Sequence, residues 1–149
     1  MVRFLIATHG MLADGFKSSV SVLMGDEIAN NIGTINAFVE NGDLDPKGRI
    51  EEIVNALGED EELIIFTDLM YGSVNQFAVS YSNKNNVHVI TGINFPVICE
   101  VISKLTFSYE EKKVSTDELL EIIDKSRGQL TYVKVVSEDN DDNEEEFFD

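Results

Sequence analysis

A histidine and an aspartate closely follow two of the apolar runs in this sequence. His9 lies behind the run from Val2 to Ala7, and Asp68 lies behind the run from Leu63 to Phe66. A carboxylate that accepts the Nδ1 proton of an imidazole fixes its tautomer and leaves the Nε2 lone pair as a nucleophile. It also stabilises the cation that forms when Nε2 gains a substituent. This pair of residue types is therefore suited to accepting a phosphoryl group.

Four neighbouring residues offer hydrogen-bond donors for the oxygens of such a group. Gly10, Gly72 and Ser73 precede predicted helices, so their backbone N–H groups and the helix dipoles favour an anion. The hydroxyl groups of Thr8 and Ser73 add further donors. The pattern implies no metal ion and no nucleotide cofactor.

Each of these residues also has an ordinary structural interpretation. A lone histidine in a sheet is most often a satisfied structural residue, and we assign that role to His88, which lies inside a predicted strand. Asp68 is of a type that commonly caps helices or forms turns. The single cysteine, Cys99, cannot form an internal disulfide and is expected to pack as a small buried residue. From its position alone, His9 fits a structural and a functional role equally well.

Short apolar runs alternate with apolar stripes at helical spacing along most of the chain. The runs predict strands at residues 2–7, 31–39, 63–66, 87–91 and 130–136. The stripes predict helices behind each of the first four strands, around residues 12–23, 46–57, 74–81 and 96–105. A fifth helix is expected to begin at Ser115 or Thr116, because Ser115 and Glu118 have the spacing of a capping box.

This alternation predicts an α/β fold, an open doubly wound sheet that is mainly parallel and has helices on both faces. In such sheets, ligands bind beyond the carboxyl ends of the strands. That rule points to Thr8–Gly10, Asp68–Ser73 and Gly92–Pro96. Because the first and third strands of doubly wound sheets are usually neighbours, we expect His9 and Asp68 to be within hydrogen-bond reach of each other.

Length and charge limit the classes of protein to which this chain can belong. Its 149 residues suit one domain, and its formal net charge of -17 argues against binding to the phosphate backbone of nucleic acids. Residues 138–149 hold eight acidic residues and no basic one, so we predict a domain over residues 1–136 and an acidic, disordered tail over residues 137–149. The apolar runs are far shorter than the roughly 18 residues of a membrane span. The sequence also starts without a signal-peptide pattern, so we expect a cytoplasmic protein with no membrane insertion.

Three segments resemble the signatures of a known family. "IATHG", "FTDLMYGSVN" and "TGINFPV" look like those of the mannose-family IIA component of the bacterial phosphoenolpyruvate-dependent sugar phosphotransferase system, with matching order over about residues 1 to 135. The resemblance implies a phosphotransferase with a phosphohistidine intermediate. Its histidine, here His9, accepts a phosphoryl group from the phosphocarrier protein HPr and passes it to a IIB domain, which phosphorylates the incoming sugar. The orienting carboxylate maps to Asp68, and the glycine and serine of the phosphate loop map to Gly72 and Ser73.

The resemblance also implies a homodimer in which a C-terminal strand, here Leu130 to Val136, is exchanged between subunits. Two other functions stay open. The related phosphocarrier subunit that serves dihydroxyacetone kinase shares the fold and the histidine but has another acceptor. A non-catalytic regulatory or interaction protein is favoured by Tyr71, which stands where the family usually has a glycine, since a bulky residue suits a positive φ poorly. The sequence does not identify the sugar.

Truncation after Ser137 is expected to leave the melting transition unchanged, apart from a small gain when charge repulsion is relieved. The reason is that the removed segment is too polar to bury much area. Thermal denaturation of the full and truncated chains at the same ionic strength measures the difference. A loss of several degrees would mean that the tail packs on the domain.

Overall fold

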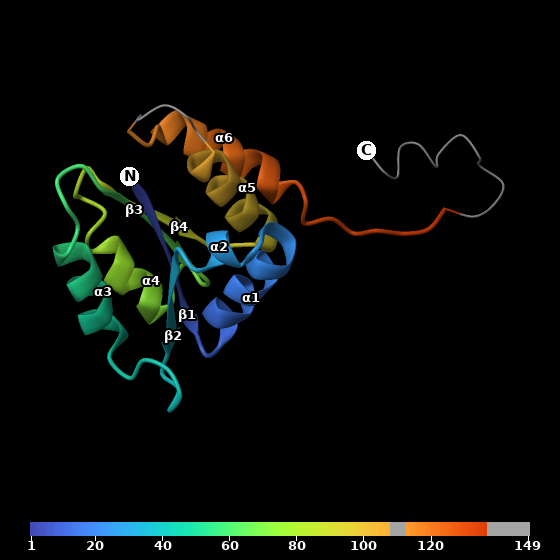
Figure 1. Ribbon diagram of the computed structural model, residues 1–149. Coiled ribbons are helices and arrows are strands. Elements are labelled where there is room, and N and C mark those ends of the chain that lie inside the picture. Colours follow the sequence, from blue (N-terminus) through green and yellow to red (C-terminus); the bar gives the residue numbers. More distant parts are fainter. Residues whose placement is uncertain (108–112, 137–149) are drawn as a thin grey trace.

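The computed structural model describes residues 1–107 and 113–136, so the tail predicted for residues 137–149 lies outside the described residues. Its centre is a four-stranded, all-parallel sheet with the strand order β2-β1-β3-β4 (Figure 1). The strands are β1 (Val2–His9), β2 (Ile32–Ala37), β3 (Glu62–Thr67) and β4 (Val87–Thr91). The predicted α/β class and the predicted parallel sheet are confirmed.

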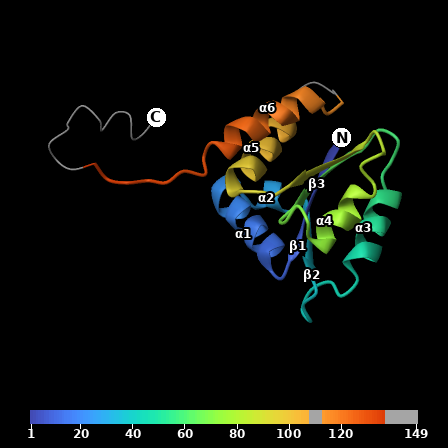
Figure 2. The ribbon, with the colours of Figure 1, turned by 180° about the vertical axis from the view of Figure 1, so that it is seen from behind.

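Helices cover both faces of this sheet, which explains why its strands are apolar without alternation. On one side lie α1 (Leu12–Met24), α2 (Asp26–Ala29), α5 (Phe95–Thr106) and α6 (Thr116–Arg127). On the other lie α3 (Pro46–Asn55) and α4 (Ser73–Val79) (Figures 1 and 2). In β1, Phe4 and Ile6 pack into the core between the sheet and α1, α2, α5 and α6. Leu5 and Ala7 pack into the core between the sheet and α3 and α4.

The starts of three helices follow from local chemistry that the sequence indicates. Asp45 caps α3 by accepting a hydrogen bond from the Gly48 N–H, and Asn94 caps α5 in the same way with the Val97 N–H. A proline stands in the first turn of each of these two helices, where its missing N–H is not needed. Ser115 caps α6, as the capping-box spacing predicts.

The strand expected at Leu130 to Val136 is not present in the single chain. These residues form no helix or strand, and they run away from the body of the domain (Figures 1 and 2). Leu130, Tyr132 and Val135 are 90%, 88% and 84% exposed. The physical reason is that a strand needs a neighbour, and no segment of the described chain pairs with this one.

Smaller differences concern three other positions. The second strand ends at Ala37, earlier than expected, because the positive φ of Phe38 turns the chain out of the sheet. The short helix α2 was not expected. Cys99 is partly rather than fully buried, and burial raises the pKa of its thiol.

Across residues 1–107 and 113–136, no helix has the length and apolar character needed to cross a membrane.

The register of the sheet brings the loops after β1 and β3 together. Ala7 on β1 is aligned with Thr67 on β3, and His9 on β1 is aligned with Ala37 on β2. Because β1 lies between β2 and β3, the chain leaves it in the middle of the carboxyl edge, where the strand order reverses direction. This switch point is where open α/β sheets bind their ligands.

Candidate functional site

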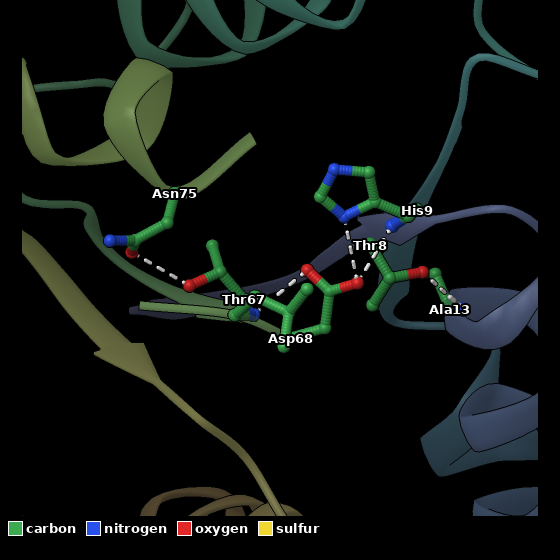
Figure 3. A network of polar contacts seen from close by, with 7 residues as sticks. Thr8, His9, Ala13, Thr67, Asp68 and Asn75 are labelled. Carbon is green, nitrogen blue, oxygen red and sulfur yellow. Dashed lines mark hydrogen bonds and ion pairs between the residues drawn. The ribbon is translucent and has the colours of Figure 1, made fainter. Parts of the chain in front are cut away.

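The predicted contact between His9 and Asp68 is present at this switch point. Nδ1 of His9 lies 3.0 Å from Oδ2 of Asp68, and the same oxygen accepts a hydrogen bond of 2.9 Å from the His9 backbone N–H (Figure 3). Oδ1 of Asp68 accepts from the Leu69 N–H at 3.0 Å. One carboxylate therefore holds both the backbone and the ring of His9, while its own position is fixed by the loop that follows β3.

Two opposing effects set the charge of Asp68. Burial raises the pKa of its carboxyl group, but the hydrogen bonds from the His9 backbone N–H and ring lower it by more, so the Asp68 pKa lies below its usual value. The side chain of Asp68 is only 11% exposed, whereas that of His9 is 38% exposed. The site thus combines a covered, ionised acceptor with an imidazole that solvent can reach.

The turn after β1 uses its polar groups to hold the backbone. Gly10 has a φ of 60°, which suits glycine, and its N–H donates to the Ala37 carbonyl at 3.0 Å. Thr8 is fully buried, and its Oγ1 accepts a hydrogen bond of 2.8 Å from the Ala13 N–H at the start of α1. In this structure both residues bond within the chain, and their roles as donors to a phosphoryl group stay predictions.

The loop after β3 is fastened by a buried amide that the sequence analysis did not single out. Thr67 Oγ1 donates to Asn75 Oδ1 at 2.8 Å (Figure 3). Asn75 Nδ2 donates to the Met70 carbonyl at 2.6 Å. Thr67 and Asn75 are 0% and 5% exposed. This network ties the end of β3 and the first turn of α4 to the loop between them, which carries Asp68.

Gly72 makes room for the imidazole. A Cβ atom at this position would stand 2.9 Å from Cε1 of His9, closer than such contacts occur, so any larger residue would displace the ring. The Gly72 N–H donates to the Leu69 carbonyl at 3.1 Å. Ser73 follows as the first residue of α4 and is partly exposed. The role of Ser73 as a donor to a phosphoryl group stays a prediction.

The positive φ that would strain a bulky residue is found at Phe38 and not at Tyr71. Tyr71 has no positive φ, so its bulk is compatible with the loop, and its side chain is 85% exposed. Phe38 is instead the one non-glycine residue with a positive φ in the described part of the chain, at 66°. Its ring centroid lies 5.8 Å from that of His9. Nothing in the type of Phe38, which favours strands, indicates this conformation.

The loop between β4 and α5 and the second histidine, His88, have structural roles. Asn94 caps α5 and also donates to the Ser126 carbonyl at 2.8 Å, which joins the start of α5 to the end of α6. His88 lies near the amino end of β4, where its Nε2 is 3.1 Å from Oε1 of Glu62. This pair is at the opposite end of the sheet from His9, as its assigned structural role predicts.

The geometry permits nucleophilic attack by one atom. With the Nδ1 proton donated to Asp68, Nε2 carries the lone pair, and the carboxylate is placed to stabilise the positive charge of a substituted ring. Within residues 1–107 and 113–136, no three side chains of the His, Cys, Asp or Glu type are grouped so that they could hold a metal ion.

Asp68→Asn is expected to lower the free energy of unfolding by about 1 kcal/mol at neutral pH, because it removes the charge that strengthens three hydrogen bonds. Since folding lowers the pKa of Asp68, the contribution is complete above the unfolded value of about 3.9 and is lost as the pH falls through the folded value. Urea denaturation at a series of pH values should show the two proteins converging below about pH 4. Glu51→Gln, at an exposed position of α3, is the control. A difference that persists unchanged into strong acid would contradict the lowered pKa.

Comparison with known proteins gives the context of this site. The sequence profile of a family described as the PTS system fructose IIA component matches residues 3–124. A IIA protein associated with the fucose utilization operon of Streptococcus pneumoniae is 27% identical, with 88% of this chain and 92% of that chain covered and a TM-score of 0.71. A candidate phosphoenolpyruvate-dependent sugar phosphotransferase system permease from Klebsiella pneumoniae is 26% identical, with coverages of 88% and 90% and a TM-score of 0.74.

A more distant relative shares the fold. The mannose/sorbose specific IIA subunit from Enterococcus faecalis is 16% identical, with 91% of this chain and 96% of that chain covered and a TM-score of 0.69. The family match spans most of the chain and includes both His9 and Asp68. The general role of this family is phosphoryl transfer in the uptake of sugars. The chain therefore belongs to the family of fructose- and mannose-type IIA components of the sugar phosphotransferase system.

Proposed function

We propose that this chain is a phosphocarrier that accepts a phosphoryl group from HPr on Nε2 of His9 and passes it to a IIB domain. The observation that carries the proposal is the 3.0 Å contact between Nδ1 of His9 and Oδ2 of Asp68, together with the partial exposure of the ring. A fixed Nδ1–H directs the lone pair of Nε2 outward. The site is thus prepared for attack before a donor arrives.

The transfer is a displacement at phosphorus. The Nε2 lone pair attacks the phosphorus atom of phosphorylated HPr, the bond from phosphorus to the donor nitrogen breaks, and its electron pair returns to the donor. His9 then carries the phosphoryl group and a positive ring, which the Asp68 carboxylate stabilises. A second displacement by a nucleophile of the IIB domain restores the neutral imidazole. Ser73 is the proposed donor to the phosphoryl oxygens.

Exposed apolar side chains support a protein as the donor. Six of them, on the loops after β1, β2 and β3 and at the start of α1, are between 47% and 85% exposed. They are Met11, Leu12, Phe38, Leu69, Met70 and Tyr71. Apolar patches of this kind, placed around a polar site, are typical of protein–protein contacts. A small phosphoryl donor would need no such surface.

The acceptor is the point on which two functions differ. Transfer to a IIB domain fits the family match, whereas transfer to a dihydroxyacetone kinase subunit would use the same first step. The regulatory alternative loses its main support, because the φ of Tyr71 is not positive. A phosphocarrier that meets HPr and a IIB domain would be cytoplasmic.

We also propose a homodimer in which Leu130 to Val136 of one protomer pairs with the sheet edge of its partner. Two observations support it. β4 pairs only with β3 among the described strands, and Oγ1 of Thr91 at its end is buried without a hydrogen-bond partner in that part of the chain. The segment itself is apolar, extended and exposed. An unpaired edge and an unpaired apolar segment are each association hazards unless they meet.

Incubation with phosphorylated HPr is expected to add one phosphoryl group per chain, in a linkage stable to alkali and labile to acid. His9→Ala should abolish the label, and the matched variant His88→Ala should keep it. Asp68→Asn should slow the labelling about 10-fold or more, because it removes the charge that fixes the tautomer. Release of the label by a IIB domain, but not by a dihydroxyacetone kinase subunit, supports the proposed acceptor. A chain that folds but takes no label would leave the regulatory function in its place.

Light scattering at micromolar concentration is expected to return the mass of two chains. Val133→Glu should shift this mass toward one chain, because a charge in the exchanged segment opposes its packing on a partner. Leu44→Glu introduces the same charge at another exposed apolar position and should leave the dimer intact. A monomer mass for the unmodified chain would rule out the dimer.

A further inference from the structure

Phe38 combines two unfavourable features that stability alone does not explain. Its φ of 66° is a conformation that bulky residues rarely adopt, and its side chain is 50% exposed. A glycine or an asparagine at this position would fit the backbone better and would expose less apolar surface. A strained backbone of this kind persists only where its surroundings hold it, and it is found mostly at functional sites.

Hydrogen bonds hold the backbone of Phe38 from both sides. Its N–H donates to the Asp43 carbonyl at 2.9 Å, and the Asp43 N–H donates to the Asn36 carbonyl at 2.8 Å. The preceding Ala37 carbonyl accepts from the Gly10 N–H at 3.0 Å. The loop after β2 is thereby fixed against the turn that follows His9, and the direction of the Phe38 side chain is set by the fold.

That direction brings the phenyl ring to the imidazole. The two ring centroids are 5.8 Å apart and the planes are tilted by 39°, a usual arrangement for interacting aromatic rings. Gly72 limits the imidazole at Cε1, and Asp68 holds it at Nδ1. Phe38 is thus a third neighbour of a ring whose orientation decides which nitrogen faces the donor.

We propose that Phe38 is a positioning residue for His9. Its strained backbone places the phenyl ring so that the imidazole stays in the orientation that keeps Nδ1 on Asp68 and Nε2 directed outward. The effect of Phe38 on phosphoryl transfer rests on the proposed phosphocarrier function, whereas its effect on the orientation of the His9 ring does not. Removal of the phenyl ring should let the imidazole rotate and exchange tautomers.

Glycine at position 38 separates the backbone from the side chain. Phe38→Gly should fold and should melt no lower than Phe38→Ala, because glycine adopts the positive φ without strain. Phe38→Tyr keeps the aromatic ring and is the conservative variant. Leu44→Ala removes an exposed apolar side chain from the same connection between β2 and α3 and serves as the control.

Two measurements test the role of the phenyl ring. The nitrogen chemical shifts of His9 report its tautomer, and we expect one dominant Nδ1–H form in the unmodified chain and a mixture in Phe38→Gly. Potassium phosphoramidate then serves as a small donor that needs no docking surface: Nε2 attacks phosphorus, the bond from phosphorus to nitrogen breaks, and ammonia leaves. We expect Phe38→Gly and Phe38→Ala to be phosphorylated about 3- to 10-fold more slowly. Phe38→Tyr and Leu44→Ala should behave like the unmodified chain.

The outcomes separate this inference from the proposed function. Wild-type nitrogen shifts and a wild-type rate in Phe38→Gly would overturn the positioning role, as would a Phe38→Tyr variant as impaired as Phe38→Gly. If the unmodified chain takes phosphate from phosphoramidate but not from HPr, the donor is wrong and the role of Phe38 is still decided by these rates. If neither donor labels His9, the phosphocarrier function fails, and the tautomer measurement alone decides whether Phe38 orients the ring.

Discussion

The site depends on two parallel strands that end at the same level. β1 and β3 are aligned from Val2 with Glu62 to Ala7 with Thr67, so the residues that follow them meet beyond the carboxyl edge of the sheet. A shift of this register would separate His9 from the Asp68 carboxylate, which holds both its backbone and its ring. The register is fixed because both faces of both strands are buried in apolar cores.

Most polar groups around His9 hold the scaffold rather than a ligand. The N–H groups of Gly10 and Gly72, the hydroxyl of Thr67 and the amide of Asn75 all bond to other parts of the chain. Buried or half-buried backbone groups need such partners, because an unsatisfied one costs free energy comparable to a lost hydrogen bond. The result is a rigid frame in which the Nε2 edge of one imidazole is left for chemistry. This division of roles suits the proposed carrier function, in which the imidazole meets two protein partners in turn.

The parts of this structure that follow from local rules could be predicted from the sequence. β4 has the predicted bounds, α3 and α5 begin at or beside the prolines that predict them, and Ser115 caps α6. The sheet rule brings His9 to Asp68. What could not be predicted depends on contacts distant in sequence. The φ of Phe38 is imposed by Asp43 and Asn36 against the preference of its residue type. The bonds of Thr8 to Ala13 and of Gly10 to Ala37 also depend on how the turn folds, and the sequence does not indicate them. The segment from Leu130 to Val136 reads as a strand but has no partner in one chain.

The central position of β1 has a consequence for the order in which the domain opens. β1 is hydrogen-bonded along both edges and belongs to both cores, whereas β4 is bonded along one edge and is followed by helices that pack on only one core. Local unfolding begins where the fewest contacts must be broken, so in a single chain the amide protons in β4 and α6 should exchange with solvent before those of β1. Fluctuations at the outer edge of the sheet can then occur while His9 and Asp68 remain in contact. His9 and Asp68 thus follow the two central strands, which are bonded along both edges.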